Sequence, residues 1–105
     1  MRINDPHKPR FPRLRYIYIY IRSALAMRRA SREVLADLQH QLDPTNIDHV
    51  AIWNMAVLDT AQTVGSIEHI RELNGCRPMS YKRNKAVVRG SLGHIMVGHL
   101  ADLNR

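Results

Sequence analysis

Two helix-terminating signals divide the chain, and this division constrains its fold more than any other feature. Asp43-Pro44 ends a first helical segment, because the residue before a proline avoids the α region. Asn74-Gly75 ends a second, because glycine readily adopts the left-handed conformation that closes a helix. Apolar residues recur at helical spacing between and beyond these signals, which predicts an all-α protein, a three-helix bundle. The expected helices span about residues 20–42, 46–73 and 81–103.

Polar residues predict where the second and third helices begin. Thr45 as N-cap, with Asp48 three residues later, forms a capping-box-like pair. Ser80 is suited to cap the third helix, since a serine oxygen accepts a hydrogen bond from a free amide of the first turn.

The segment Tyr16–Ile21 alternates tyrosine with isoleucine, which is the period of a β-strand. No second alternating run exists to pair with it, and a lone strand leaves its backbone groups unsatisfied. Two outcomes remain open: the segment pairs with its copy in a dimer, or it joins the helix that follows. We favour the helix.

Residues 1–15 are rich in cations and hold prolines at every third position, at Pro6, Pro9 and Pro12. This spacing blocks a helix and favours an extended arm. We therefore expect a basic Pro/Arg-rich N-terminal arm over residues 1–15 and a single helical domain over residues 16–105, a length that suits one domain.

The first half of the second helix, from Ile47 to Leu58, is apolar nearly all round. A helix of this kind usually lies at the centre of a bundle or in an oligomer interface. We therefore expect a homo-oligomer or a subunit of a larger complex, with an interface formed by Trp53, Met55 and Val57.

Charge is distributed in three blocks, within a net charge of +7. Residues 1–32 carry nine cations and one acid, residues 33–75 one cation and seven acids, and residues 76–105 six cations and one acid. Such asymmetry favours a polyanionic partner. In the alternative, the basic ends fold onto the acidic middle. Surface ion pairs are worth only ~0–1 kcal/mol each, and the excess positive charge would remain.

Arginine suits phosphate because its planar fork donates bidentate hydrogen bonds while it stays charged. Arg22, Arg28, Arg29 and Arg32 share one helical sector, and the tyrosines beside the arm are suited to stack on unpaired bases. The cations expected to contact nucleic acid are Arg10, Arg13, Arg15, Arg22, Arg28, Arg29, Arg32, Lys82, Arg83, Lys85 and Arg89.

Signals of catalysis are lacking. No phosphate-binding loop, nucleophile elbow or dinucleotide fingerprint occurs. His94 and His99 are about 140° off a shared helix face, which does not suit a zinc site. Gly90 and Gly93 have the spacing of a KH-domain loop, but such a loop lies among strands, so a helix-packing contact is favoured. We expect no enzymatic activity, no metal and no cofactor.

Cysteine usage and hydropathy indicate the compartment. The single cysteine, Cys76, cannot form an internal disulfide, which suits a reducing environment. No apolar run is long enough for a transmembrane helix. We expect an intracellular protein, either cytoplasmic or mitochondrial.

These patterns predict a non-enzymatic nucleic-acid-binding accessory protein that contacts mainly phosphates, with RNA or a ribonucleoprotein favoured over DNA. One alternative is an interaction or inhibitor protein that docks an acidic protein surface, or a small subunit of a complex, through the apolar second helix. A further alternative is peripheral membrane association through Tyr16–Met27, with arginines at anionic headgroups.

Overall fold

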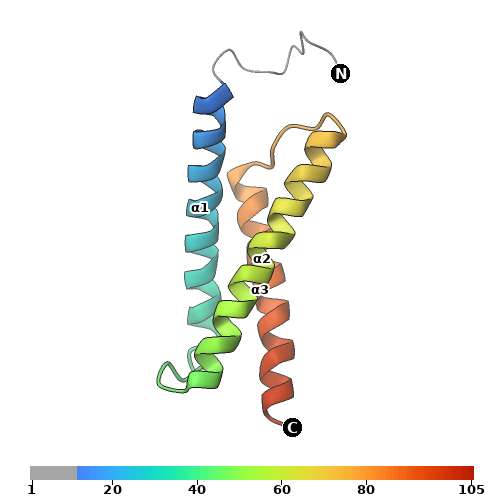
Figure 1. The fold of residues 1–105 in the computed structure, drawn as a ribbon. Helices are drawn as coiled ribbons and strands as arrows, with labels where there is room; N and C mark the ends of the chain where they lie inside the picture. The colour runs from blue at the N-terminus through green and yellow to red at the C-terminus, as the bar shows by residue number, and fades with distance from the viewer. Residues whose placement is uncertain (1–11) are drawn as a thin grey trace.

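Three helices make up the fold. The computed structural model describes the backbone of residues 12–105 and the side chains of residues 17–105. The helices are α1 (Pro12–Asp37), α2 (Ile47–Leu73) and α3 (Tyr81–Leu103), and this part of the chain contains no strand. α1 and α3 run in the same direction, and α2 runs opposite to both (Figure 1). The predicted all-α fold of three packed helices is confirmed.

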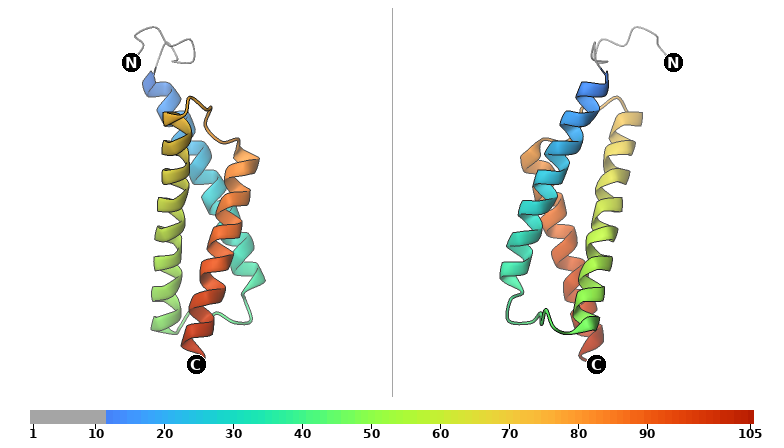
Figure 2. Two further views of the ribbon diagram at one scale, coloured as in Figure 1. Left: turned by 90° about the vertical axis from the view of Figure 1, so that its right-hand side faces the viewer. Right: turned by 60° about the vertical axis from the view of Figure 1, so that its left-hand side comes forward.

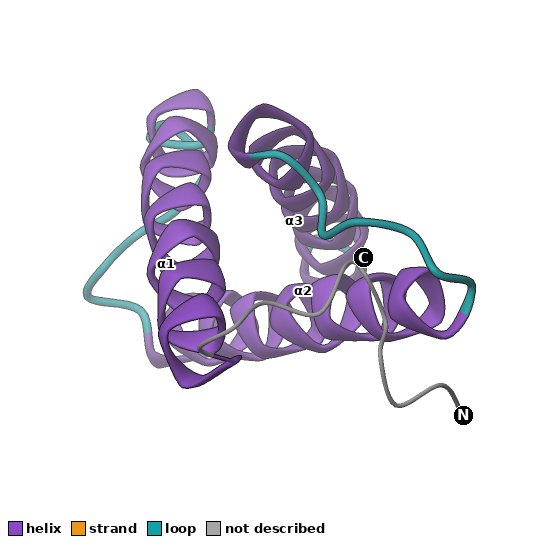
Figure 3. Cartoon of the chain, turned by 90° about the horizontal axis from the view of Figure 1, so that it is seen from above, coloured by secondary structure: helices purple, strands orange, loops and turns teal. Residues whose placement is uncertain are grey.

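α3 is the helix that holds the bundle together. It packs against both α1 and α2, which contact each other little. The crossing of α1 and α3 is seen in Figure 2, and Figure 3, which looks from above, shows α2 on one side of that pair. The radius of gyration is 16.7 Å, against about 13 Å for a compact domain of about 100 residues. The bundle is therefore elongated, and each helix keeps a long face in solvent.

α1 begins at Pro12, earlier than predicted. Proline suits the first helical turn, because its missing N–H is not needed there and its φ angle is already helical. Residues 12–15, which were expected in the extended arm, are therefore helical, and the rest of the arm lies outside the described residues. The Tyr16–Ile21 segment lies inside α1, so the chain takes the helical outcome.

The turn between α1 and α2 corrects one predicted cap. Asn46, not Thr45, is the N-cap of α2: its side-chain oxygen accepts from the amides of Asp48 at 2.9 Å and His49 at 3.3 Å. Thr45 instead donates its amide and its hydroxyl to the Asp43 carboxylate, at 2.9 and 2.6 Å. The N-cap prediction was wrong because Asp43 already engages the threonine hydroxyl. α1 itself ends at Asp37, so the predicted end near Leu42 was too late. Residues 38–41 form turns instead, in which the Gln41 amide donates to the Leu38 carbonyl at 2.8 Å.

The other two predicted boundaries are confirmed. Gly75 has a φ angle of 73°, its amide donates to the Glu72 carbonyl at 3.0 Å, and the Cys76 amide donates to the Arg71 carbonyl at 2.8 Å. These bonds form a Schellman motif that closes α2. Ser80 caps α3, since its hydroxyl accepts from the Arg83 amide at 3.1 Å.

Two clusters of buried apolar side chains form the core, and α3 contributes to both. The larger cluster consists of Val34, Leu38, Ala56, Leu92, Met96 and Leu100. The smaller consists of Ala30, Val64, Met79 and Val88. A buried polar contact adds to them: Asn84 of α3, only 1% exposed, donates to the Ser23 hydroxyl of α1 at 3.1 Å. The core therefore fixes α1 against α3 and leaves the outer surface of α2 uncovered.

Candidate nucleic-acid interface

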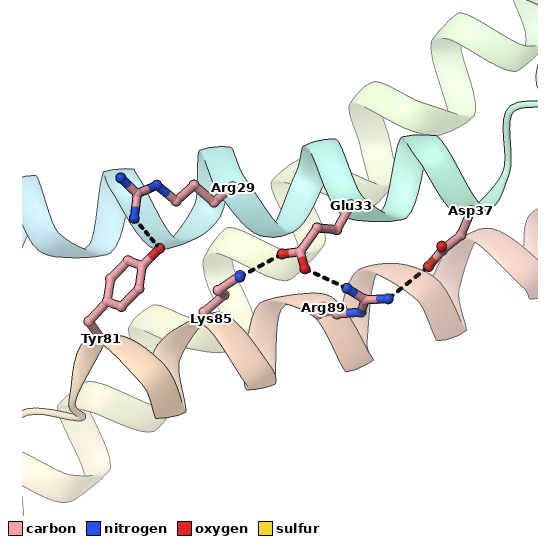
Figure 4. A network of polar contacts seen from close by, with 6 residues as sticks. All are labelled: Arg29, Glu33, Asp37, Tyr81, Lys85 and Arg89. Carbon is pink, nitrogen blue, oxygen red and sulfur yellow. Dashed lines mark hydrogen bonds and ion pairs between the residues drawn. The ribbon is translucent and has the colours of Figure 1, made fainter.

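An ion-pair network joins α1 to α3 (Figure 4). Lys85 Nζ lies 2.8 Å from Glu33 Oε2. Arg89 bridges two carboxylates, with Nη1 at 2.7 Å from Glu33 Oε1 and Nη2 at 3.0 Å from Asp37 Oδ2. Glu33, Asp37, Lys85 and Arg89 are partly exposed, so solvent reaches every member of this network.

The network lowers the pKa of Glu33 from its ordinary value of 4.5. The hydrogen bond from Lys85 is the largest cause, desolvation opposes it, and the charges of Lys85 and Arg89 add to the lowering. A carboxylate with a lowered pKa is ionised at neutral pH. Two of the cations expected to contact nucleic acid, Lys85 and Arg89, therefore neutralise acids of α1 instead of facing solvent unpaired.

Beyond the network, towards the N-terminal end of α1, the two helices form a shallow groove of about 250 Å³. We call it the tyrosine–arginine groove; its lining residues are Tyr18, Ile21, Arg22, Leu25, Arg29 and Tyr81. The Arg29 guanidinium lies 5.6 Å from the centre of the Tyr81 ring and donates to the Tyr81 hydroxyl at 3.0 Å. The Arg22 guanidinium lies 5.5 Å from the centre of the Tyr18 ring.

The remaining predicted cations divide into two groups. Arg28 and Arg32 of α1 and Lys82 and Arg83 in the first turn of α3 are exposed. Neither these four nor the two arginines of the groove lie within ion-pair distance of a carboxylate among residues 17–105. Arg10 lies outside the described residues. Arg13 and Arg15 belong to the first turn of α1, but the description of side chains begins after them.

Tyr81 is the groove residue that sequence reasoning missed. It follows the Ser80 cap and precedes Lys82 and Arg83, and an aromatic residue beside two cations is the only local signal. Its contact with Arg29 depends on how α3 crosses α1, which no local pattern encodes. Of the tyrosines selected from the sequence, Tyr18 lines the groove, whereas Tyr20 is 74% exposed and does not.

The predicted interface on α2 is only partly at the surface. Trp53 and Val57 are half-buried and pack against the larger core cluster. Met55 is 55% exposed, Leu58 is 63% exposed and Ile47 is 83% exposed. On a helical projection, Leu58 and Ile47 lie within about 80° of Met55. We call Ile47, Met55 and Leu58 the outer α2 face.

Two other features are absent from the described residues, a metal site and a membrane-spanning helix. No group of three or more histidine, cysteine, aspartate or glutamate side chains in the described part of the chain could hold a metal ion. Within the same residues, no helix combines the length and the apolar character needed to cross a membrane. We found no match to this chain among protein-family models, curated proteins or solved structures.

Proposed function

We propose that this protein binds nucleic acid without catalysing a reaction, mainly through phosphate contacts, and that RNA or a ribonucleoprotein is its partner. What supports the proposal is the division of its cations. Lys85 and Arg89 form ion pairs with Glu33 and Asp37, the two acids of α1 that face α3. The neighbouring cations have no acidic partner among the described residues. These available cations are Arg22, Arg28, Arg29, Arg32, Lys82 and Arg83.

Binding of this kind depends on counterion release. Each phosphate that a lysine or arginine neutralises releases condensed cations, so affinity falls as salt rises. If all six available cations contact a single strand, the slope of log K against log salt is about −4. Phosphate contacts alone carry no sequence information, so we expect weak sequence selectivity.

The test is a fluorescence-anisotropy titration of a labelled single-stranded RNA over a range of salt concentrations. We expect Arg28→Gln combined with Arg32→Gln to weaken binding and to flatten the salt dependence. The control for the loss of one charge is Arg105→Gln, which removes a cation beyond the C-terminal end of α3, where Arg105 pairs with Asp102 at 3.7 Å. It should change binding less than Arg28→Gln or Arg32→Gln alone. Affinity that does not fall as salt rises would contradict the proposal.

A second candidate function is supported by the outer α2 face. Exposed apolar side chains that recur on one helical face are typical of an interface. Leu58 is 63% exposed, and of its two neighbours in the sequence only Asp59 is charged. We propose self-association, or docking to another protein, through this face. Sedimentation equilibrium tests the first form: Leu58→Glu should reduce the mass of an oligomer. Thr63→Glu, which places the same charge at an exposed position about 140° away around α2, should not. A wild-type chain that is monomeric at high concentration would contradict self-association.

A further inference from the structure

We infer that the tyrosine–arginine groove binds one unpaired nucleotide of a single strand, with its base stacked in the groove and its phosphate held by Arg22 and Arg29. This inference rests on the proposed function and identifies a site within it. It adds a contact to the base that the phosphate contacts of the proposal do not require.

The groove offers surfaces on which a base can stack. Tyr18 from α1 is 64% exposed, and Tyr81 from α3 is half-buried and lines the same groove. Arg22 and Arg29 hold their guanidinium groups near these rings, at 5.5 and 5.6 Å from the ring centres. Unpaired bases stack on tyrosine rings and on the planes of arginine side chains alike. Both kinds of surface are therefore available within one site.

The size and the apolar lining of the groove suit a single base. Its volume is about 250 Å³, below the roughly 300–1,000 Å³ of sites that hold drug-sized ligands. Ile21 and Leu25, which are 51% and 41% exposed, add apolar surface to the same groove. A flat ring can cover these side chains, whereas a phosphate group alone cannot.

The arginines of the groove retain donors for a phosphate. A guanidinium has five N–H donors, and the described contacts of Arg29 use one of them, on the Tyr81 hydroxyl. Arg22 Nε is shielded from water and has no acceptor among the described residues. A buried donor without an acceptor is unfavourable, so rotation of Arg22 towards a bound phosphate would relieve that cost. Lys82, which follows Tyr81 in the first turn of α3, is exposed and adds a further cation for the strand.

The test measures how tightly two oligonucleotides of equal charge bind to this protein. One is a labelled ten-nucleotide uridine strand, and the other is an abasic strand with the same number of phosphates. We expect the uridine strand to bind roughly ten-fold more tightly, because stacking is lost with the bases. Tyr18→Leu and Tyr81→Leu should remove most of this preference, measured as the ratio of the two affinities for each variant. Tyr81→Phe, which keeps the ring, should retain the preference.

Tyr20→Leu is the matched control, since Tyr20 is exposed on α1 outside the groove; it should leave the preference intact. If Tyr81→Leu fails to fold by circular dichroism, Tyr18→Leu decides, because that ring is mostly in solvent. Salt-dependent binding of both strands with equal affinity would overturn the inference and leave the proposed function standing. No binding of either strand would overturn both. The inference would also be overturned if phosphatidylserine vesicles displaced the uridine strand equally well from the wild type and from the tyrosine variants.

Discussion

Glu33 of α1 and Lys85 of α3 face each other across the helix pair, with 2.8 Å between Oε2 and Nζ. The second oxygen of the same carboxylate accepts from Arg89 at 2.7 Å, so one glutamate holds two cations. This contact links the two helices outside the apolar core. It also removes two positive charges from the surface that we propose for nucleic acid.

The first prediction concerns pH. The pKa of Glu33 is lowered from 4.5 in the folded chain, chiefly by Lys85. The ion pair therefore stabilises the fold fully above pH 4.5, and this stabilisation is lost as the pH falls through the lower folded-state pKa. Glu33→Gln should unfold at a lower temperature than the wild type at neutral pH, and the difference should shrink under acid conditions. Thermal unfolding followed by circular dichroism at several pH values measures this.

Asp43 also loses stabilising contacts in acid, because the hydrogen bonds from Thr45 lower its pKa from the ordinary value of 3.8. Wild type and Glu33→Gln share that contribution, so the difference between their curves isolates Glu33. Two curves that stay parallel down to acid pH would show that the Glu33 pairs do not stabilise the folded chain.

The second prediction compares two lysines of α3. Lys82 is exposed and has no carboxylate partner in the described residues, whereas Lys85 is paired with Glu33. Lys82→Gln and Lys85→Gln each remove one charge, only three residues apart. We expect Lys82→Gln to reduce the salt slope of single-strand binding by about 0.7, the value for one lost phosphate contact. Lys85→Gln should leave the slope nearly unchanged. Equal effects of the two variants would mean that only overall charge matters.

Much of this fold could be predicted because its boundaries are encoded locally. Gly75 ends α2 through its own backbone conformation, and Ser80 caps α3 through its own hydroxyl. The start of α1 was mispredicted because three regularly spaced prolines were interpreted together, although Pro12 occupies the first position of α1, where proline favours a helix. Thr45 was mispredicted because a competing acceptor, Asp43, lies two residues before it.

The candidate site was less predictable, because tertiary packing decides it. Closeness in the sequence groups Lys85 and Arg89 with Lys82 and Arg83, but it cannot show that the first two face Glu33 and Asp37. The crossing of α1 over α3 sets those pairs. The same crossing brings Tyr81 against Arg29, from residues that lie far apart in the sequence.

The third prediction tests the revised cap of α2. Asn46→Ala removes the side chain that accepts from two amides of the first turn, so it should lower the free energy of unfolding by about 1 kcal/mol. Thr45→Ala should cost clearly less, because the threonine bonds Asp43 outside the helix. Urea unfolding at neutral pH gives both values. A larger loss at Thr45 than at Asn46 would favour the capping box that the sequence predicted.

The last prediction contrasts two glycines with opposite roles. Gly75 has a positive φ angle, at which any side chain is strained, so Gly75→Ala should destabilise the chain by about 1 kcal/mol. Gly90 lies within α3, and a Cβ added there meets nothing within 4 Å. Gly90→Ala should therefore stabilise the chain by about 0.5–1 kcal/mol, through its better helix propensity.

The helix-packing contact expected at Gly90 is thus not made within one copy of the described chain. If Gly90→Ala instead lowered stability in a manner that depends on protein concentration, another backbone would have to lie against α3 at this position. Unfolding measured at two concentrations separates these cases, because only an intermolecular contact makes the midpoint depend on concentration.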